Sequence, residues 1–323
     1  MHRRSFLGVI GVLFGTPPRA VARERTFRIG YLHPSNPNDI AYVAFRHALS
    51  DAGYRVGEST RLEARFANGD IARLPALAEE LVSSKVDVIV AVSPTAIRAA
   101  REATRSIPIV MAFSGDDPVK SGFAASLARP GGNTTGLTAV AHDIAPKWIE
   151  LLAELKPGLK VVGVLRSPAR ADHDAQVATM RVAAQARGIR LHIVEVHGRD
   201  EYDDALLAIQ QAGSEALVVL SGPEFTANRV RLVELAIGRG LPSAFQFAEF
   251  AQAGGLVSYG PDIAALSARA VDYVDRILKG ADPAEMPIEQ PRKLYLVVNR
   301  RTADSLGLTI PRWLLLQADR VIQ

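Results

Sequence analysis

The chain has 323 residues, 48% of them hydrophobic and 22% charged, a composition typical of a soluble globular protein with room for two domains. It has no cysteine, which excludes disulfides, thiolate catalysis and zinc–thiolate sites. Removing Arg3, Arg4 and Arg19 with the segment described next lowers the net charge from +4 to +1, with 35 basic and 34 acidic residues left. These basic residues are interspersed with acidic ones, which argues against a nucleic-acid partner.

Residues 1–22 have the pattern of an export signal. The basic pair Arg3-Arg4 precedes an apolar run over residues 6–15 and the small-residue cleavage pattern Ala20-Val21-Ala22. About ten apolar residues are too few for a membrane-spanning helix, which needs roughly twenty. The arginine pair with its following residues resembles a twin-arginine signal, and a Sec signal with an incidental arginine pair is the alternative. Without cysteine there is no lipid attachment site, so we expect a soluble periplasmic protein cleaved near Ala22.

Beyond this segment, strand-like and helix-like runs alternate. The first half predicts strands at residues 27–32, 60–66, 86–92 and 107–113 and helices at 39–53, 71–85 and 94–104. A Pro/Gly-rich break at 128–136 follows, which we interpret as a connection between lobes. The second half predicts helices at 148–155, 175–188, 202–212, 226–239 and 263–279 and strands at 161–165, 191–196, 216–220, 256–259 and 294–298. Continuous apolar strands indicate parallel sheets covered by helices on both faces.

The two halves resemble each other. Each contains a helix, a buried strand, a turn of small residues with a proline (Pro94 and Pro223), a second helix, and a step through Pro108 or Pro242 into another strand. This predicts an α/β fold of two doubly wound parallel-sheet lobes. Ligands of such sheets bind at the carboxyl ends of the strands, so two facing lobes would surround one cleft.

Searches for catalytic motifs find no nucleotide-binding glycine loop and no nucleophile elbow. The cluster Asp172-His173-Asp174 and the pair His142-Asp143 are interpreted as solvated charge in loops rather than as metal ligands or an acid/base pair. Asp116, which follows a strand directly, is either a ligand-binding group or part of a capping turn. We therefore expect no cofactor, no metal and no enzymatic activity.

The stretch Ser93-Pro94-Thr95 stands between a buried strand and a helix. Serine is a good N-cap and proline suits the first helical position. The free N–H groups of the first helical turn, at the positive end of the helix dipole, suit a carboxylate. A helix cap and an anion site are compatible, so both interpretations stand. The glycines that a phosphate cradle needs are missing.

Five segments together resemble one family, the periplasmic substrate-binding proteins of ABC transporters, in the branch associated with amino-acid-like and aromatic ligands. They lie at residues 73–91, 107–119, 126–136, 241–262 and 273–311. The resemblance implies a type I periplasmic-binding fold with three hinge connections, expected near Leu137–Ala139, Ala253–Leu256 and Glu285–Pro291. The expected N-terminal lobe is residues 27–137 plus about 256–285, and the expected C-terminal lobe is residues 138–253 plus about 291–323.

The resemblance also places the ligand-facing positions. We expect Ser93 and Thr95 to hold a carboxylate, Phe225 or Phe247 to stack on an apolar or aromatic group, and Asp116 or Glu224 to take an ammonium. An arginine at position 166 would favour a second acidic group on the ligand. The full expected set is Leu32, His33, Ser93, Pro94, Thr95, Ser114, Asp116, Thr138, Arg166, Ser167, Glu224, Phe225, Phe247 and Tyr259.

The implied function is that of a receptor for a small carboxylate-bearing metabolite, which closes around its ligand and docks on an inner-membrane ABC permease. A sensory protein that presents its ligand to a membrane receptor is the alternative, and an enzyme on the same scaffold is a third hypothesis without a coherent set of catalytic residues. We expect a monomer.

Overall fold

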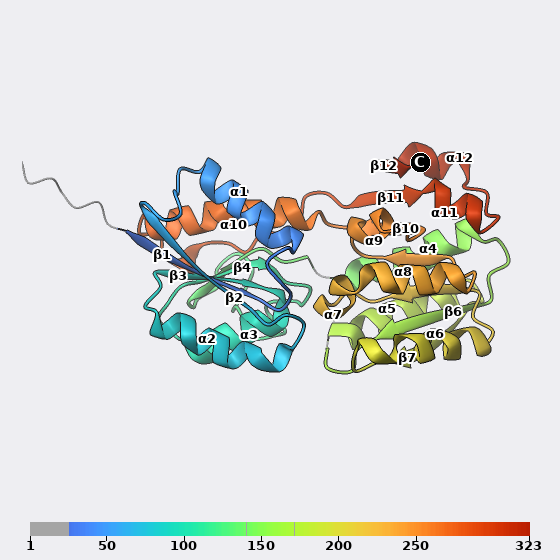
Figure 1. Ribbon diagram of the computed structural model, residues 1–323, viewed down its shortest axis with the longest axis horizontal. Coiled ribbons are helices and arrows are strands. Elements are labelled where there is room, and N and C mark those ends of the chain that lie inside the picture. Colours follow the sequence, from blue (N-terminus) through green and yellow to red (C-terminus); the bar gives the residue numbers. More distant parts are fainter. Residues whose placement is uncertain (1–25, 140, 171) are drawn as a thin grey trace, which may run out of the picture.

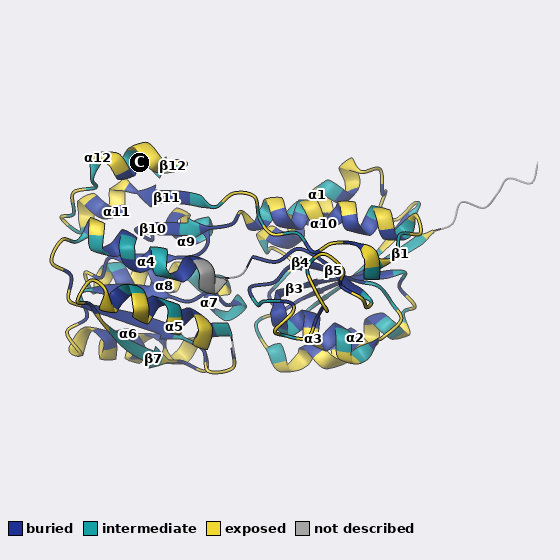
Figure 2. Cartoon of the chain, turned by 180° about the vertical axis from the view of Figure 1, so that it is seen from behind, coloured by how far each residue is buried: buried dark blue, intermediate teal, exposed yellow. Residues whose placement is uncertain are grey.

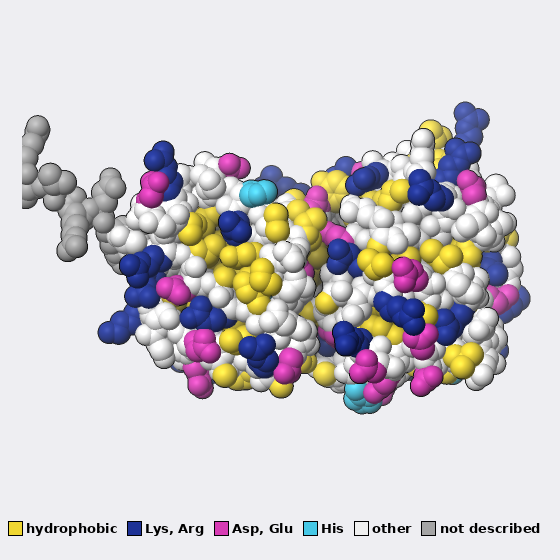
Figure 3. All heavy atoms as spheres, viewed as in Figure 1, with side chains coloured by type: hydrophobic (Ala, Val, Ile, Leu, Met, Phe, Trp, Pro, Cys, Tyr) yellow, Lys and Arg dark blue, Asp and Glu magenta, His cyan; other side chains and the backbone are white. Residues whose placement is uncertain are grey.

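The computed structural model describes residues 26–139, 141–170 and 172–323, leaving aside the side chains of 141–143. The expected export signal therefore lies outside the described residues. Two α/β lobes lie side by side along the long axis of the molecule (Figure 1). Buried residues are concentrated in the two sheets and on the helix faces turned towards them (Figure 2). On the face seen in Figure 3, basic and acidic side chains are intermixed over both lobes. No helix among the described residues is long and apolar enough to cross a membrane.

The first lobe is built on a five-stranded sheet of order β2-β1-β3-β4-β5, in which every neighbouring pair is parallel. Its strands are β1 (Phe27–His33), β2 (Thr60–Phe66), β3 (Val88–Val92), β4 (Ile109–Phe113) and β5 (Thr134–Gly136). Its helices are α1 (Ile40–Asp51), α2 (Leu74–Ser83), α3 (Ser93–Ala103) and, from late in the chain, α10 (Ile263–Leu278), with a 3-10 turn at Ile71–Arg73. All residues of β3 and β4 are buried, as expected for parallel strands covered on both faces.

The second lobe has a seven-stranded sheet of order β12-β11-β10-β9-β8-β6-β7. Its strands are β6 (Val161–Arg166), β7 (Arg190–Glu195), β8 (Ala216–Val219), β9 (Ser243–Phe245), β10 (Val257–Gly260), β11 (Tyr295–Asn299) and β12 (Arg320–Ile322). Its helices are α4 (Ala141–Leu155), α5 (Asp172–Gln185), α6 (Tyr202–Gln211), α7 (Pro223–Ala227), α8 (Arg229–Gly238), α9 (Ala248–Gln252), α11 (Arg300–Ser305) and α12 (Arg312–Gln317), with a 3-10 turn at Arg199–Glu201. A further 3-10 turn, Pro283–Glu285, follows α10 and packs on β5 of the first lobe. The pair β10–β11 is antiparallel, unlike the rest of the sheet.

The similarity of the two halves is visible in the strand order. The run β7-β6-β8-β9-β10 repeats the order β2-β1-β3-β4-β5, and the unit β8–α7–α8–β9 stands where β3–α3–β4 stands in the first lobe. In both sheets the first strand lies beside the third, so the order reverses between β1 and β3 and again between β6 and β8. Such a switch point opens a crevice at the carboxyl ends of the strands, where ligands bind.

The chain crosses between the lobes three times, and one crossing differs from the expectation. The first follows β5, and the third approaches β11, where Leu137 and Glu289 form a β-bridge between the two connections. The second was expected at Ala253–Leu256, with the first lobe resuming at about residue 256. Instead, β10 pairs with β9 and β11, and the chain enters the first lobe only between Gly260 and α10, which packs on α1 and β4. Because the short strand β10 pairs with β9 and β11, it belongs to the second lobe, so the first lobe resumes after Gly260 rather than at about residue 256.

Candidate functional site

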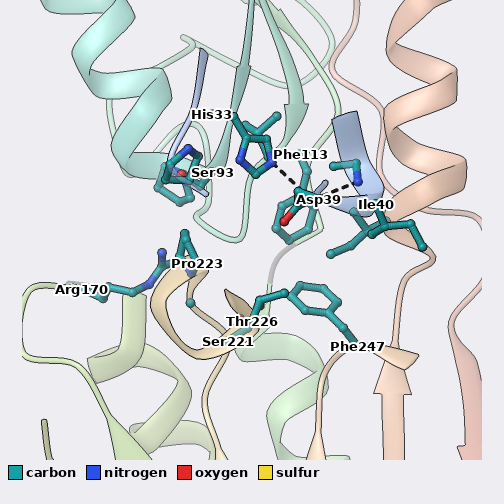
Figure 4. Close-up of a pocket in the computed structure, with 16 residues that line it drawn as sticks. His33, Asp39, Ile40, Ser93, Phe113, Arg170, Ser221, Pro223, Thr226 and Phe247 are labelled. Carbon is teal, nitrogen blue, oxygen red and sulfur yellow. Dashed lines mark hydrogen bonds and ion pairs between the residues drawn. The ribbon is translucent and has the colours of Figure 1, made fainter. Parts of the chain in front are cut away.

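A cavity lies between the lobes, at the carboxyl ends of β1 and β3 on one side and of β6 and β8 on the other (Figure 4). Its volume is about 50 Å³, room for several waters but not for an amino acid. The lining residues come from both lobes: His33, Pro34, Asp39, Ile40, Ala41, Val92, Ser93, Pro94, Phe113, Arg170, Ser221, Gly222, Pro223, Thr226, Phe247 and Ile263. Of the expected site residues, His33, Ser93, Pro94 and Phe247 are among them.

Ser93 lies where β3 turns into α3, and its backbone is strained. Its φ is +79°, in the left-handed region that side-chain-bearing residues rarely adopt. Val92, rather than Ser93, is the N-cap residue of α3, and Pro94 lies in the first turn. The Ser93 hydroxyl lies 2.9 Å from the Thr95 hydroxyl and 3.5 Å from the Ala96 N–H. The turn thus aims a buried hydroxyl and the start of α3 at the cavity.

His33 and Asp39 line the first-lobe side of the cavity (Figure 4). His33 ends β1 and is 3% exposed, and its Nδ1 accepts the Ser35 N–H at 2.9 Å. Asp39 is the N-cap of α1, where its Oδ1 accepts the Ala41 N–H at 3.0 Å and lies 3.4 Å from His33 Nε2. Burial acts to raise the pKa of Asp39, but the contacts with His33 and Ala41 outweigh it and the pKa is lowered. Asp39 is therefore a carboxylate at neutral pH.

Two phenylalanines from opposite lobes meet in the cavity wall. The rings of Phe113, at the end of β4, and Phe247, after β9, pack edge to face with centroids 5.6 Å apart. Edge-to-face geometry is favourable for aromatic pairs, and a third ring placed here would find the same kind of contact. Phe225, the other expected stacking residue, does not line the cavity. It is fully buried in the second lobe, against His173 and Tyr202.

A buried charge cluster surrounds Arg170, which lines the cavity from the second lobe. Its Nη2 donates to Asp172 Oδ2 at 2.7 Å, and the two side chains are 5% and 8% exposed. The Nε atom has no hydrogen-bond partner among the described residues. Asp172 also accepts from Gln176 at 3.2 Å, and His173 is completely buried, with a pKa lowered by burial and by Arg170. The interpretation of residues 172–174 as solvated charge is therefore wrong for the first two.

Asp116 faces this cluster from the first lobe without lining the cavity. A Cβ built on the neighbouring Gly115 would lie 3.6 Å from Asp172 Oδ2, so the lobes are close here. Burial and, second, the charge of Asp172 raise the pKa of Asp116, against the opposing effect of Arg170. Its Oδ1 has no hydrogen-bond partner in the described part of the chain. A carboxylate with an unmatched oxygen thus faces a guanidinium across the lobe boundary.

The remaining expected residues do not line the cavity: one of them holds a loop beside it, and the others lie apart from it. Thr138 Oγ1 donates to the carbonyls of Ser114 and Asp116 at 3.1 and 3.0 Å, which ties the first crossing to the loop after β4. Arg166 is held by Asp174 at 2.6 Å and by Glu195 at 3.3 Å, outside the cavity. The others outside the cavity lining are Leu32, Thr95, Ser114, Ser167, Glu224 and Tyr259.

The sequence reasoning missed Asp39, Phe113 and Arg170. Asp39 was counted as the start of a helix, and Phe113 as the end of a buried strand. Arg170 follows β6, so the rule that ligands bind at the carboxyl ends of strands could have identified it from the sequence. Nothing in the described chain groups three or more histidine or acidic side chains as a metal site.

Comparisons with known proteins agree with this architecture. A family model described as ABC transporter substrate binding protein matches residues 33–322. A curated relative, the "Tyrosine-binding protein" of Clostridioides difficile strain R20291, is 26% identical over 284 residues, which cover 85% of this chain and 78% of the relative.

Among solved structures, an ABC domain from Streptococcus pneumonia in complex with L-Trp has a TM-score of 0.84 and 24% identity, covering 92% of this chain and 100% of that one. A conserved domain protein from Vibrio cholerae reaches 0.86 at 24% identity, with the same coverage. The ligand-free, open structure of a substrate-binding protein from Clostridium difficile reaches 0.65 at 22% identity, covering 92% of this chain and 99% of that one. These similarities show the same two-lobed fold.

Proposed function

Because the chain belongs to the ABC transporter substrate-binding protein family, we propose that it is the exported receptor of an ABC importer for an amino-acid-like ligand with an aromatic side chain. Members of this family are solute-binding proteins that work with an ABC permease, not enzymes. The observation that carries the proposal is the cavity between the lobes, in which Phe113 and Phe247 approach each other from opposite sides. The tyrosine-binding relative and the L-Trp complex support an aromatic ligand.

The head group of the ligand belongs at the polar end of the cavity. The proposal places its carboxylate on the Ser93 hydroxyl and the first N–H groups of α3, with Thr95 supporting Ser93 from behind. Arg170 faces this position from the second lobe with an unpaired Nε, and gives the carboxylate a second partner. Glu224 and Asp116 both act electrostatically on Arg170, so they are near enough to attract the ammonium group.

Ligand entry and retention require the lobes to move. A cavity of about 50 Å³ has to widen before an aromatic amino acid enters it. The higher TM-score to the L-Trp complex (0.84) than to the open structure (0.65) supports a closed arrangement of the lobes here. In the proposed cycle, a ligand that contacts both lobes makes its full set of contacts only in the closed state, so binding shifts the hinge equilibrium towards it. The proposal includes a monomer in the periplasm, exported by the signal in residues 1–22.

A thermal-shift screen of the purified protein tests this function. The panel holds the common amino acids, aromatic acids without an amino group, small carboxylates and sugars. Because a ligand of the native state stabilises it, an aromatic amino acid at 100 times its Kd adds about 2.7 kcal/mol to the free energy of unfolding and raises Tm.

Two variants test whether the ligand-induced rise in Tm comes from binding in this cavity. Phe247→Leu removes a ring from the cavity and should abolish most of the shift. Phe123→Leu removes a ring that is 3% exposed and outside the cavity lining, so it should lower the Tm of the free protein while leaving the ligand-induced shift unchanged. A panel in which only sugars raise Tm, or in which no aromatic amino acid does, contradicts the proposal.

A further inference from the structure

Two polar atoms in the first-lobe wall of the cavity have hydrogen-bonding capacity left over. His33 Nδ1 accepts the Ser35 N–H, so the proton of the neutral imidazole lies on Nε2. Nε2 is buried and has no hydrogen-bond partner among the described residues, because its 3.4 Å approach to Asp39 Oδ1 does not have hydrogen-bond geometry. A buried donor without a partner costs free energy that a suitable ligand atom would recover.

Asp39 supplies the matching acceptor. Its Oδ1 already accepts the Ala41 N–H and faces His33, while Oδ2 has no hydrogen-bond partner in the described chain. Asp39 lines the cavity next to Ile40, and Phe113 and Phe247 complete this end of it (Figure 4). One donor and one acceptor therefore sit side by side at the apolar end of the cavity, away from Arg170.

A phenolic hydroxyl matches this pair because it both donates and accepts one hydrogen bond. We propose that His33 and Asp39 determine specificity by binding the side-chain hydroxyl of a tyrosine-like ligand, which donates to Asp39 Oδ2 and accepts from His33 Nε2. An indole N–H satisfies Asp39 alone, and a phenyl ring satisfies neither. This rests on the proposed function and adds the order of preference tyrosine, tryptophan, phenylalanine.

The chief alternative for Asp39 is the ligand's ammonium group. The charge of Arg229, on the second lobe, acts on Asp39, and His33 is in contact with it, so part of its negative charge is already compensated. Ile40 and Ala41, which follow Asp39 in the wall, are apolar, whereas Arg170, whose Nε has no partner among the described residues, faces the other end of the cavity and can bind the ligand's carboxylate there. A neutral donor on an apolar ring fits these surroundings better than the charged head group.

Calorimetric titration of the full protein with tyrosine, tryptophan and phenylalanine tests the inference. Sites that bind a substrate hydroxyl discriminate strongly against the analogue that lacks it, so we expect tyrosine to bind at least about 100-fold more tightly than phenylalanine. Asp39→Ser keeps an N-cap residue on α1 but withdraws the carboxylate from the cavity. It should weaken tyrosine binding by about 10- to 100-fold, as loss of a hydrogen bond to a charged group does, and change phenylalanine binding by less than about 2-fold.

Asp262→Ser is the matched control. Asp262 is the N-cap of α10 in the same lobe, accepts the Ala265 N–H at 3.0 Å, and is not in the cavity lining. This variant should retain the wild-type preference for tyrosine. If Asp39→Ser fails to fold, 4-aminophenylalanine on the wild-type protein replaces it, since its amino group donates to Asp39 and should restore most of the affinity that phenylalanine lacks.

Two results overturn the inference while leaving the proposed function intact. One is a wild-type protein that binds phenylalanine as tightly as tyrosine. The other is an Asp39→Ser variant that loses affinity for both ligands equally, which would make Asp39 the ammonium partner. Failure of every aromatic amino acid to bind contradicts the proposed function itself, and the inference with it.

Discussion

At the scale of single residues, the site depends on backbone and charge states that the residue types only partly reveal. Ser93 was expected as a helix cap, and its hydroxyl does face the first turn of α3 at 3.5 Å from the Ala96 N–H. Its φ of +79° is a property of the turn between β3 and α3, because the strand and the helix dictate the direction of the chain there. Strain of this kind persists only where surrounding structure enforces it, commonly at ligand sites.

Asp116 leads to a prediction about pH. Its pKa is raised by burial and by Asp172, so the folded protein holds this proton more tightly than the unfolded chain. The stabilising contribution of a group with a raised pKa is present below its unfolded value, ordinarily 3.8, and is lost as the pH rises through the folded value. At pH 7 the charge on the Asp116 carboxyl therefore lowers the free energy of unfolding.

We expect Asp116→Asn to raise Tm at pH 7 by about 2–4 °C, and to leave stability unchanged near pH 3, where the carboxyl is protonated in both states. Thermal denaturation at the two pH values checks this. Asp117→Asn is the control: Asp117 caps the turn at the Val119 N–H, a role that asparagine fills equally well, so no rise is expected. An Asp116→Asn protein that is less stable at pH 7 would show that the charge stabilises the closed lobes through Arg170.

At the scale of elements, the short strand β5 decides how the first crossing leaves its lobe. The Pro/Gly-rich stretch before it was interpreted as a connection, but residues 134–136 pair with β4 and extend the sheet. Gly136 ends the strand at φ +125°, and a Cβ there would collide with the backbone N and O atoms of Met111. Only glycine allows the chain to turn this close to β4 before it crosses.

Gly136→Ala should therefore destabilise the protein by about 3 kcal/mol or more, because it combines a disfavoured φ with a backbone clash. Urea denaturation followed by circular dichroism measures the loss. Gly132→Ala, four residues earlier, is the comparison: nothing lies within 4 Å of the methyl group that alanine would add there, and the φ of Gly132 is not in the left-handed region, so the change should be within about 0.5 kcal/mol. Equal stability of the two variants would mean that β5 rearranges freely.

At the scale of the whole molecule, the three crossings are the connections that the proposed lobe closure would bend. Thr138 N–H donates to the Glu289 carbonyl at 2.9 Å, and the Glu289 carboxylate is held by Arg269 of α10 at 3.0 and 3.2 Å. The first and third connections are thus joined to each other and anchored to the first lobe. Bending should be concentrated beyond Glu289, towards β11.

Small-angle X-ray scattering checks lobe closure. If the free protein opens to admit ligand, saturation with the best ligand of the thermal-shift screen should reduce the radius of gyration and narrow the distance distribution. The expected change is a small decrease in the radius of gyration, as a hinge closure around a ligand produces. The same measurement on Phe247→Leu with ligand is the control and should show little compaction. Identical scattering curves with and without ligand in the wild type would rule out closure as the response to binding.

The sequence by itself determined the class of fold and most of the elements that carry it. Apolar runs with period 2 or 3.6 are local signals, so β2 was located to the residue, and α10 to within one residue at its end. The alternation of such runs in two similar halves then predicted two doubly wound lobes with a cleft between them. The end of a buried strand at Ser93 suggested a ligand position from the residues alone, whereas His33 was expected only from the family resemblance.

Only the tertiary structure decided which side chains meet in that cleft. Phe113 and Phe247 are more than a hundred residues apart in the chain, and their rings touch because two separate sheets face each other. Phe225 is the immediate neighbour of the lining residue Thr226 and yet turns into the core, because the short helix α7 directs it away from the cavity. Arg170 and Asp172 are buried together, although charged loops are usually solvated, because each compensates the charge of the other. Sequence periodicity reports which face of an element is apolar, whereas the partner of that face depends on how the lobes pack.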